Sequence, residues 1–333
     1  MVTIKDIAKI AGVSHTTVSR ALNNNAKIKP QTRQRIMKIA EDLKYVPNLN
    51  AKSLVTNKNY TVGLFFSSIE SGTSSSFLAN TLKVMYEGLD ENYLLSVGAI
   101  ENITNIDTAL RNRFDGILVL SQSDKDDDFI YQAKNLKIPL VVLNRHVEDD
   151  SIINIIGDDR QGVKKALQMA YQAGHRKFGL IEGIPNFKST SERRQGFFDV
   201  LSQTDAKLST QTVKTGDYST ESGKKAMLEI LSLKERPDLV FCSNDDMAIG
   251  ALKACYEQGI KVPDEISLIG FDNIHYSQYT NPSLTTIERP INKMSRLGLS
   301  YLVQLMNGES FDQQKQIQLE TQVVIRETVK GLN

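Results

Sequence analysis

The first 45 residues carry apolar side chains at the spacing of three short helices. In the first stretch the apolar residues recur every three or four positions, at Ile4, Ile7, Ala8 and Ala11. Thr3 is a good N-cap for that helix, and Gly12 is typical of its end. The same spacing predicts a second helix that begins after the cap Ser14 and ends near Leu22, and a third over about 30–44. Two short helices joined by a glycine-containing turn, with a third beside them, form the helix-turn-helix arrangement.

From Tyr60 onward the pattern changes to short, nearly continuous apolar runs. They are VGLFF (62–66), LLSVGAI (94–100), GILVL (116–120), PLVVL (139–143), FGLIEG (178–183), LVFCS (239–243) and ISLIGFD (266–272). Helices are expected between them, near 77–91, 105–113 and 129–136, after Asp159, from about Ser191 and after Asp245. Apolar strands that alternate with helices are typical of a parallel sheet covered on both faces. About 270 residues exceed one such domain, so we expect two α/β lobes.

Charge is distributed unevenly over the 333 residues. The net charge of the chain is +1, yet residues 1–58 contain eleven Lys or Arg and only three Asp or Glu, a net charge of +8. A small basic head on a larger acidic body indicates that the head alone binds a polyanion, although a solvated basic face without a partner has the same charge. The helix-turn-helix pattern favours DNA as that partner.

The second helix of such a unit enters the major groove with its first turns. His15, Thr16 and Arg20 are expected to point outward there, because arginine donates in a fork to guanine and threonine contacts thymine or a base edge. Simple solvation of His15 and Thr16 is the weaker alternative in so basic a unit. The other candidate DNA-binding residues of the head, placed for phosphates or helix ends, are Thr3, Ser14, Thr17, Ser19 and Lys29.

The segment PNLNAKSLV (47–55) follows the third helix. Pro47 ends that helix and is a good first residue for a new one. A helix this short is unstable alone in water, so it needs a second copy of itself or DNA. Leu49 and Leu54 either pack on the neighbouring domain or belong to a paired helix in the minor groove, where Leu54 wedges a base step and kinks the duplex.

Two stretches of the head resemble a known family. TIKDIAKIAGVSHTTVSRALN (3–23) and TRQRIMKIAEDLKYVPNLNAKSL (32–54) closely resemble the DNA-binding head and hinge of the LacI/GalR family of bacterial transcription repressors. The resemblance implies that His15, Thr16 and Arg20 lie at the base-reading positions. The hinge residues it places in the minor groove are Ala51, Lys52 and Leu54, with Leu54 as the intercalating leucine. Asn48 is a further candidate DNA-binding residue of this segment.

Polar residues of the body lie near predicted strand ends, the edge at which such sheets bind ligands. They are Ser67, Ser68, Arg193, Tyr218, Asn244, Asp245 and Asp272. Carboxylates, an amide and a guanidinium hydrogen-bond hydroxyl pairs, and an aromatic ring covers an apolar sugar face, so this set suits a polyhydroxylated ligand. Structural alternatives stay open for three of them: Asp245 and Asp272 as helix N-caps, and Arg193 in an ion pair.

Two stretches of the body, 243–273 and 281–290, look like the effector domain of the same family, which has the periplasmic sugar-binding fold. The resemblance implies that Arg193, Asn244 and Asp272 contact the effector and that Tyr218 stacks on it. It also implies the domain boundaries: 1–46 as the helix-turn-helix domain, 47–58 as hinge helix and linker, and 59–333 as the effector-binding and dimerisation domain, with lobe 1 at about 60–158 and 290–318 and lobe 2 at about 159–288 and 319–333.

Other classes of protein find little support in the sequence. Nucleotide-binding loops, hydrolase motifs and metal-ligand spacings are absent, so we expect no enzyme, no cofactor and no metal site. Two cysteines, no signal peptide and no apolar run of transmembrane length indicate a reduced, cytoplasmic setting. The basic head argues against a solute-binding protein of a transporter.

We therefore expect a homodimeric repressor of a carbohydrate-utilisation operon. Its two heads bind the halves of an operator in double-stranded DNA, and a small-molecule effector, expected to be a sugar, shifts the lobes and with them the hinge segments. The sequence leaves open whether the effector releases the protein from DNA or promotes DNA binding. In the second case the effector is a corepressor, such as a nucleobase or a phosphorylated carrier protein. No leucine heptad follows Arg326, so a dimer is expected rather than a tetramer.

Overall fold

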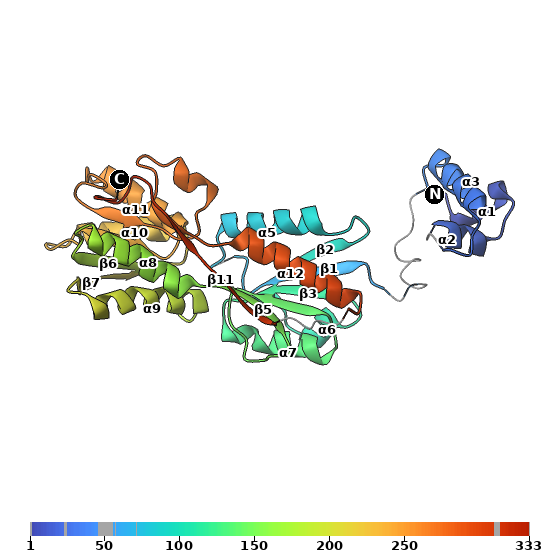
Figure 1. Cartoon of the computed structure of the whole chain (residues 1–333), viewed down its shortest axis with the longest axis horizontal. Helices are drawn as coiled ribbons and strands as arrows, with labels where there is room; N and C mark the ends of the chain where they lie inside the picture. Colours follow the sequence, from blue (N-terminus) through green and yellow to red (C-terminus); the bar gives the residue numbers. More distant parts are fainter. Residues whose placement is uncertain are drawn as a thin grey trace. The chain divides into compact units, whose positions relative to one another are not determined.

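The computed structural model describes residues 2–22, 25–45, 56, 58–70, 72–309 and 314–332. The chain divides into two compact units, Met1–Asn59 and Tyr60–Asn333, which are described separately (Figure 1). The predicted hinge helix of 47–55, with Asn48, Ala51, Lys52 and Leu54, lies outside the described residues. Within the ranges given, no helix is both long and apolar enough to cross a membrane.

The described residues of the first unit form three helices around a small apolar core. They are α1 (Ile4–Ala11), α2 (His15–Leu22) and α3 (Pro30–Asp42) (Figure 1). α1 ends at Gly12, whose φ of 63° lies in the left-handed region that glycine adopts without cost. α3 ends at Asp42, two residues before the predicted end, because Lys44 has a φ of 49° that an α-helix does not contain. All three helices contribute buried core residues, among them Ile7, Val18 and Ile36. The predicted helix-turn-helix arrangement is confirmed.

One half of the second unit, lobe 1, is built on a six-stranded parallel sheet. Its strands in spatial order are β11 (Gln316–Leu319), β5 (Ile153–Gly157), β4 (Leu140–Leu143), β3 (Gly116–Leu120), β1 (Thr61–Phe66) and β2 (Leu94–Ala99). One face is covered by α5 (Ser75–Gly88) and α12 (Ile291–Met306), the other by α6 (Ile106–Leu110) and α7 (Asp127–Asn135) (Figure 1). Because both faces are covered, central strands such as β3 are buried along their whole length.

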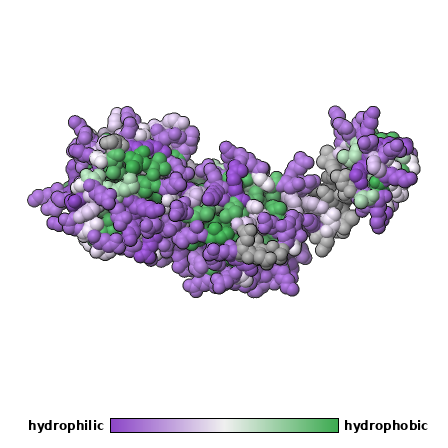
Figure 2. All heavy atoms as spheres, viewed as in Figure 1, coloured by the Kyte–Doolittle hydropathy of each residue, from purple (hydrophilic) through white to green (hydrophobic). Residues whose placement is uncertain are grey.

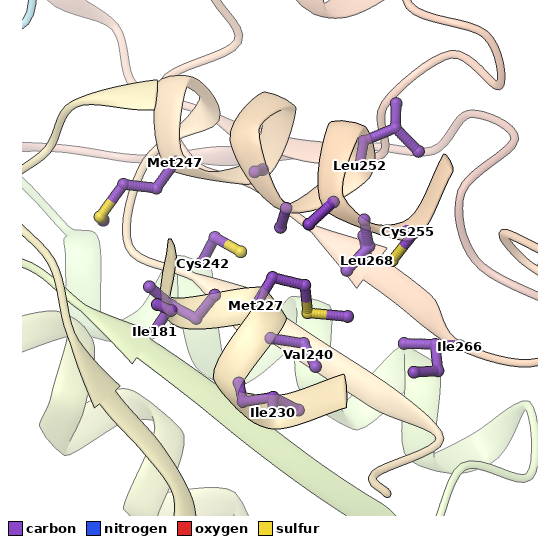
Figure 3. Packing of buried hydrophobic residues seen from close by; sticks show 14 of the residues in the cluster. Ile181, Met227, Ile230, Val240, Cys242, Met247, Leu252, Cys255, Ile266 and Leu268 are labelled. Carbon is purple, nitrogen blue, oxygen red and sulfur yellow. The ribbon is translucent and has the colours of Figure 1, made fainter. Parts of the chain in front are cut away.

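The other half, lobe 2, repeats this architecture around a four-stranded parallel sheet. Its strands in spatial order are β7 (Lys207–Thr215), β6 (Lys177–Glu182), β8 (Leu239–Cys242) and β9 (Ser267–Ile269). One face packs on α8 (Asp159–Gln172) and α9 (Lys188–Gln203), the other on α10 (Thr220–Leu231) and α11 (Asp245–Glu257). Cys242 and Cys255 are free thiols buried among aliphatic side chains (Figure 3). Burial raises the pKa of Cys255 to about 12, so this thiol is inert.

The chain passes between the two lobes three times. A short antiparallel pair, β10 (Thr286–Glu288) and β12 (Gln322–Val324), adjoins lobe 2. The three passages run from β5 to α8, from β10 to α12 and from β11 to β12. Two α/β lobes with parallel sheets, preceded by a helical head, confirm the predicted fold class.

Candidate functional site

The exposed face of α2 carries the residues predicted to read bases. Ser14 caps the helix, since its Oγ accepts a hydrogen bond of 3.1 Å from the backbone N–H of Thr17. In the register that this cap fixes, Val18 and Ala21 are buried in the core of the head. The exposed residues are His15, Thr16 and Arg20. The structure therefore brings the three predicted base-reading side chains to one solvent-facing helix.

The residues predicted to contact phosphates differ in how their side chains are used. The hydroxyls of Ser14 and Thr17 hydrogen-bond to each other over 2.9 Å within the cap of α2. Thr3 Oγ1 donates to Asp6 Oδ2 over 2.8 Å, and hydrogen bonds from Thr3 lower the pKa of this carboxyl. Ser19 is partly exposed and Lys29, directly before α3, is exposed. The cap hydroxyls thus fix two helix N-termini, while Lys29 presents a positive charge to solvent.

A narrow cavity between the lobes gathers four of the seven residues predicted to bind an effector. Lobe 2 and the passage to α12 line it with Ser189, Arg193, Tyr218, Asn244, Asp272 and Arg289, and lobe 1 lines it with Gly72, Ser74, Phe77 and Gln122. The cavity has a volume of about 30 Å³. Sites for small organic ligands have volumes of roughly 300–1,000 Å³, so a sugar enters only when the lobes separate or side chains move.

Four charged side chains meet beside this cavity and form what we call the charge quartet: Arg193, Asp159, Asp272 and Arg289. Arg193 donates from Nε to Asp159 Oδ2 over 2.9 Å, and its Nη2 lies 3.5 Å from Asp272 Oδ1. Arg289 Nε lies 3.1 Å from Asp159 Oδ1. The guanidinium of Arg193 also covers the Phe271 ring at 3.7 Å. Two positive and two negative charges therefore balance in a buried site, as buried charges require.

Burial and neighbouring charges oppose each other in the quartet. Burial raises the pKa of Asp272 to about 6, while Arg193 and Arg289 act to lower it. Burial alone would lower the pKa of Arg193, but Asp159 and Asp272 outweigh it and leave that pKa raised. Asp272 also has a φ of 107°, a conformation that side chains other than glycine rarely adopt. A strained carboxylate at a cleft is typical of a functional position.

Tyr218 and Asn244 are held together at one wall of the cavity. Asn244 caps α11, because its Oδ1 accepts from the Met247 N–H over 2.9 Å, and its Nδ2 donates to the Tyr218 carbonyl over 2.9 Å. The Tyr218 ring stacks on Phe187 with 21° between the ring planes. Gly183 leaves room for this ring, since a Cβ there would lie 2.1 Å from Tyr218 Cζ. Asn244 therefore positions the aromatic residue, with both ends of its amide occupied.

Asp245 requires a correction, because the structure does not bring it to the cavity. The residue is fully buried inside lobe 2. There its Oδ2 accepts from the Ile274 N–H over 2.8 Å and its Oδ1 from Thr286 Oγ1 over 2.5 Å. Burial raises the pKa of this carboxyl well above its usual value. The contacts favour a structural role, although the helix N-cap is Asn244 and not Asp245.

Ser67 and Ser68 line a different cavity between the lobes. It has a volume of about 400 Å³ and is walled on the lobe 2 side by residues 184–187. Ser67 Oγ donates to Asp126 Oδ2 over 2.5 Å and accepts from the Gln122 N–H over 2.7 Å. This hydroxyl therefore fixes the chain after β3, and the two serines are separate from the residues around the charge quartet.

Sequence reasoning missed several polar residues near the cleft. Gln122, Asn144 and Asp159 follow β3, β4 and β5, so the strand-end rule would have found them if applied to every strand. Asn144 lines a larger cavity of about 510 Å³, and its buried Nδ2 has no hydrogen-bond partner among the described residues. Arg289 directly follows β10, a three-residue strand that is not among the predicted apolar runs. Across the described parts of the chain, no group of His, Cys, Asp or Glu could hold a metal ion.

Two family models match the chain. The model of bacterial regulatory proteins of the lacI family matches residues 3–48, and the model of the periplasmic binding protein-like domain matches residues 167–329. A probable HTH-type transcriptional repressor ExuR of Bacillus subtilis (strain 168) is 46% identical over 332 residues, covering 100% of this chain and 99% of the relative. The HTH-type transcriptional repressor CytR of Escherichia coli (strain K12) is 30% identical over 336 residues, covering 99% and 97%.

Solved structures share the fold over nearly the full length. The lac repressor dimer bound to operator and the anti-inducer ONPF has a TM-score of 0.83 at 25% identity, covering 98% of this chain and 99% of its own. The complex of the transcriptional regulator CelR with cellobiose has a TM-score of 0.70 at 25% identity, covering 98% and 100%. With a relative 46% identical along its whole length, the chain belongs to the lacI family of bacterial regulatory proteins, which are DNA-binding regulators of transcription.

Proposed function

We propose that the chain represses carbohydrate-utilisation genes, binds operator DNA as a homodimer and responds to a sugar in the interlobe cleft. The observation that carries the proposal is the joint presence of an exposed polar helix, α2, and a cleft lined by a buried charge quartet. The relatives named above are repressors, and one of the similar structures holds cellobiose.

DNA recognition divides between base reading and backbone contact. His15, Thr16 and Arg20 read base edges in the major groove, with Arg20 donating in a fork to guanine. The caps made by Thr3 and Ser14 aim helix N-termini at phosphates, and Thr17, Ser19 and Lys29 add polar contacts. The hinge residues Ala51, Lys52 and Leu54 remain predicted minor-groove contacts, and Asn48 remains a predicted DNA contact.

A polyhydroxylated ligand suits the cleft because fixed donors and acceptors stand side by side there. Arg193 and Asp272 bind neighbouring hydroxyls as donor and acceptor, and the Tyr218 ring covers an apolar sugar face. Asn144 offers the free donor of its Nδ2 in the adjoining cavity of about 510 Å³. That cavity has room for the part of the ligand that the narrow centre does not accommodate.

The dimer surface is proposed at the outer edge of lobe 1. β2 is an edge strand, and large apolar side chains on it and on α5 are exposed, namely Leu94 (59%), Val97 (40%) and Tyr86 (70%). Figure 2 shows apolar residues over both lobes on an otherwise mostly hydrophilic surface. An exposed edge strand with apolar side chains is a liability unless a partner covers it. One of the similar structures is described as a dimer.

Selection of duplexes from a random pool by the full-length chain tests the DNA-binding part of this proposal. We expect enrichment of a pseudo-palindromic site, because two heads related by a two-fold axis bind it, and affinity that falls steeply with salt. A thermal-shift screen with sugars then tests the cleft, since a ligand that binds the folded state raises its unfolding temperature. A pool without any enriched sequence would contradict the proposal.

A further inference from the structure

We infer that Gln122 is a latch that holds the lobes closed, and that a hydroxyl group of the ligand must replace its side chain at Ser189. Gln122 follows β3 in lobe 1, and Ser189 lies in the first turn of α9 in lobe 2. The inference deepens the proposed function, since it concerns how the same cleft admits its ligand. Only the claim that the replacing group is a hydroxyl of a sugar rests on the proposed function.

Gln122 bonds to both lobes at once. Its Nε2 donates to the Gly72 carbonyl over 3.2 Å within lobe 1, and its Oε1 accepts from Ser189 Oγ over 3.1 Å in lobe 2. Its backbone carbonyl accepts from the Lys188 N–H over 2.9 Å. The Gly72 carbonyl only accepts, which fixes the orientation of the amide and leaves Oε1 facing Ser189. One residue, 8% exposed, therefore carries two hydrogen bonds between the lobes.

Other links between the lobes lie near the latch. The ion pair of Lys188 with Asp124 spans 3.2 Å, but both side chains are largely exposed, and such pairs contribute little. Asp246 of lobe 2 is hydrogen-bonded by Ser74 of lobe 1, but burial raises the pKa of Asp246, which opposes its charged form. The bonds of Gln122 are buried and uncharged, so their free energy is less screened by solvent.

The hydroxyl groups around Ser189 have too few protons for their contacts. Ser189, Thr190 and Tyr218 bring three O–H protons. Four oxygen–oxygen contacts need one each: Ser189 to Gln122 Oε1 (3.1 Å), Ser189 to Tyr218 (3.0 Å), Tyr218 to Thr190 (2.6 Å) and Thr190 to the Ile184 carbonyl (2.8 Å).

Gln122 Oε1 and the Ile184 carbonyl can only accept, so one of these contacts always lacks a proton. If Thr190 donates to Ile184 and Tyr218 to Thr190, the single proton of Ser189 is shared between Gln122 and Tyr218. The bond from Ser189 to Gln122 is therefore weaker than an undisputed hydrogen bond.

A ligand with a hydroxyl group supplies the missing proton. When this hydroxyl lies between Gln122 and Ser189, its O–H donates to Gln122 Oε1. Ser189 then donates either to the oxygen of the ligand hydroxyl or to Tyr218. Every hydrogen-bonding group of the cluster is then satisfied while the lobes move apart. Gln122 is thus a specificity-determining residue that favours a hydroxyl donor and rejects a group that only accepts.

Hydrogen–deuterium exchange of the full-length chain, without DNA or sugar, tests the latch. We compare the wild type with Gln122→Ala, Ser189→Ala and the double variant, and use Gln132→Ala on α7 as the matched control. Loss of one buried hydrogen bond corresponds to exchange roughly 2- to 12-fold faster in peptides covering 68–77 and 184–191. Peptides from β3 and β6 report the stability of the lobes themselves and should not change.

The double variant decides between a latch and two unrelated structural roles. If Gln122 and Ser189 act through one contact, the double variant exchanges no faster than the faster single variant. Gln122→Glu should open the lobes as alanine does, because it turns an oxygen toward the Gly72 carbonyl. Unchanged exchange at both peptides in either single variant, or effects that multiply in the double variant, would overturn the inference. Neither result bears on DNA or sugar binding, so the proposed function is tested separately.

Discussion

Asn244 and Asp245 show how finely the cleft depends on single residues. Both follow β8 in the sequence, yet Asn244 lines the cavity and Asp245 is buried inside lobe 2. Asn244 is the N-cap with extended backbone, whereas Asp245 is the first helical residue, so the two side chains leave the chain in different directions. The strand-end rule predicts which residue types gather at a sheet edge. It does not predict which of two adjacent polar residues faces the cavity.

Arg20→Ala should weaken operator binding by about 1–3 kcal/mol and relax the preference at one base pair, because a forked contact to guanine is lost. Fluorescence anisotropy against single-base operator variants measures this. Lys29→Ala is the matched control: loss of a phosphate contact should weaken binding on all sequences alike and reduce the salt dependence. A uniform loss for Arg20→Ala as well would contradict its base-reading role.

Asp272 makes stability depend on pH in a predictable direction. The pKa of its carboxyl rises from 3.8 to about 6 on folding, so between these values the folded state holds a proton that the unfolded state has lost. Stability from this group is therefore lost as the pH rises from about 4 to 6. The side chain of Asn does not ionise, so the Asp272→Asn variant does not lose this stability. Its unfolding temperature should therefore increase relative to that of the wild type as the pH rises.

Thermal unfolding at pH 4, 5, 6 and 7 checks the prediction for Asp272. The exposed Asp264→Asn serves as control and should show no such trend. A difference between Asp272→Asn and the wild type that stays constant over this range would show that burial does not shift the Asp272 carboxyl.

At the scale of elements, most strands with apolar runs were predictable, including the edge strands β2 and β9, whereas the polar edge strands β7 and β11 were not. The runs at β1, β3, β4 and β8 are buried throughout, so their apolar residues are continuous. β7 and β11 lie at sheet edges and are mostly partly exposed or exposed, which leaves sequences such as KLSTQTVKT without an apolar pattern. β5 is apolar but is not among the predicted strands. Asp159, which follows β5, was therefore not predicted as a site residue.

Ser14→Ala should destabilise α2 by about 0.5–2 kcal/mol, because the N-cap that accepts from the Thr17 N–H is lost. Hydrogen exchange of peptides within residues 2–22 measures this locally, since the head and the body are separate compact units. Thr16→Ala, on the exposed face of the same helix, should leave exchange nearly unchanged. Equal exchange in both variants would show that the cap is unimportant.

At the scale of the whole molecule, each lobe has its own core and the connection between them is slight. Separate apolar clusters pack on both faces of each sheet, and three passages of the chain join the lobes. Such an architecture allows the lobes to move as bodies about the passages while their cores stay intact. In the proposed function, occupancy of the cleft moves the lobes relative to each other, and this motion reaches the proposed dimer surface on lobe 1.

Leu94→Glu should dissociate the proposed dimer, because it places a charge within the proposed apolar edge on β2. Sedimentation velocity of the full-length chain over a range of concentrations measures the oligomeric state. Ile325→Glu, which also replaces an exposed apolar residue, is the matched control and should remain dimeric. A Leu94→Glu variant as dimeric as the wild type would place the interface elsewhere.

Coupling between the cleft and the operator is the central claim, and one titration tests it most directly. The full-length chain is titrated onto the selected operator at fixed salt, with and without the sugar that most raises its unfolding temperature. We predict that a saturating sugar changes the apparent Kd by about 5- to 150-fold, and that Arg193→Ala removes this change. The same Kd with and without a sugar that demonstrably binds would contradict the account.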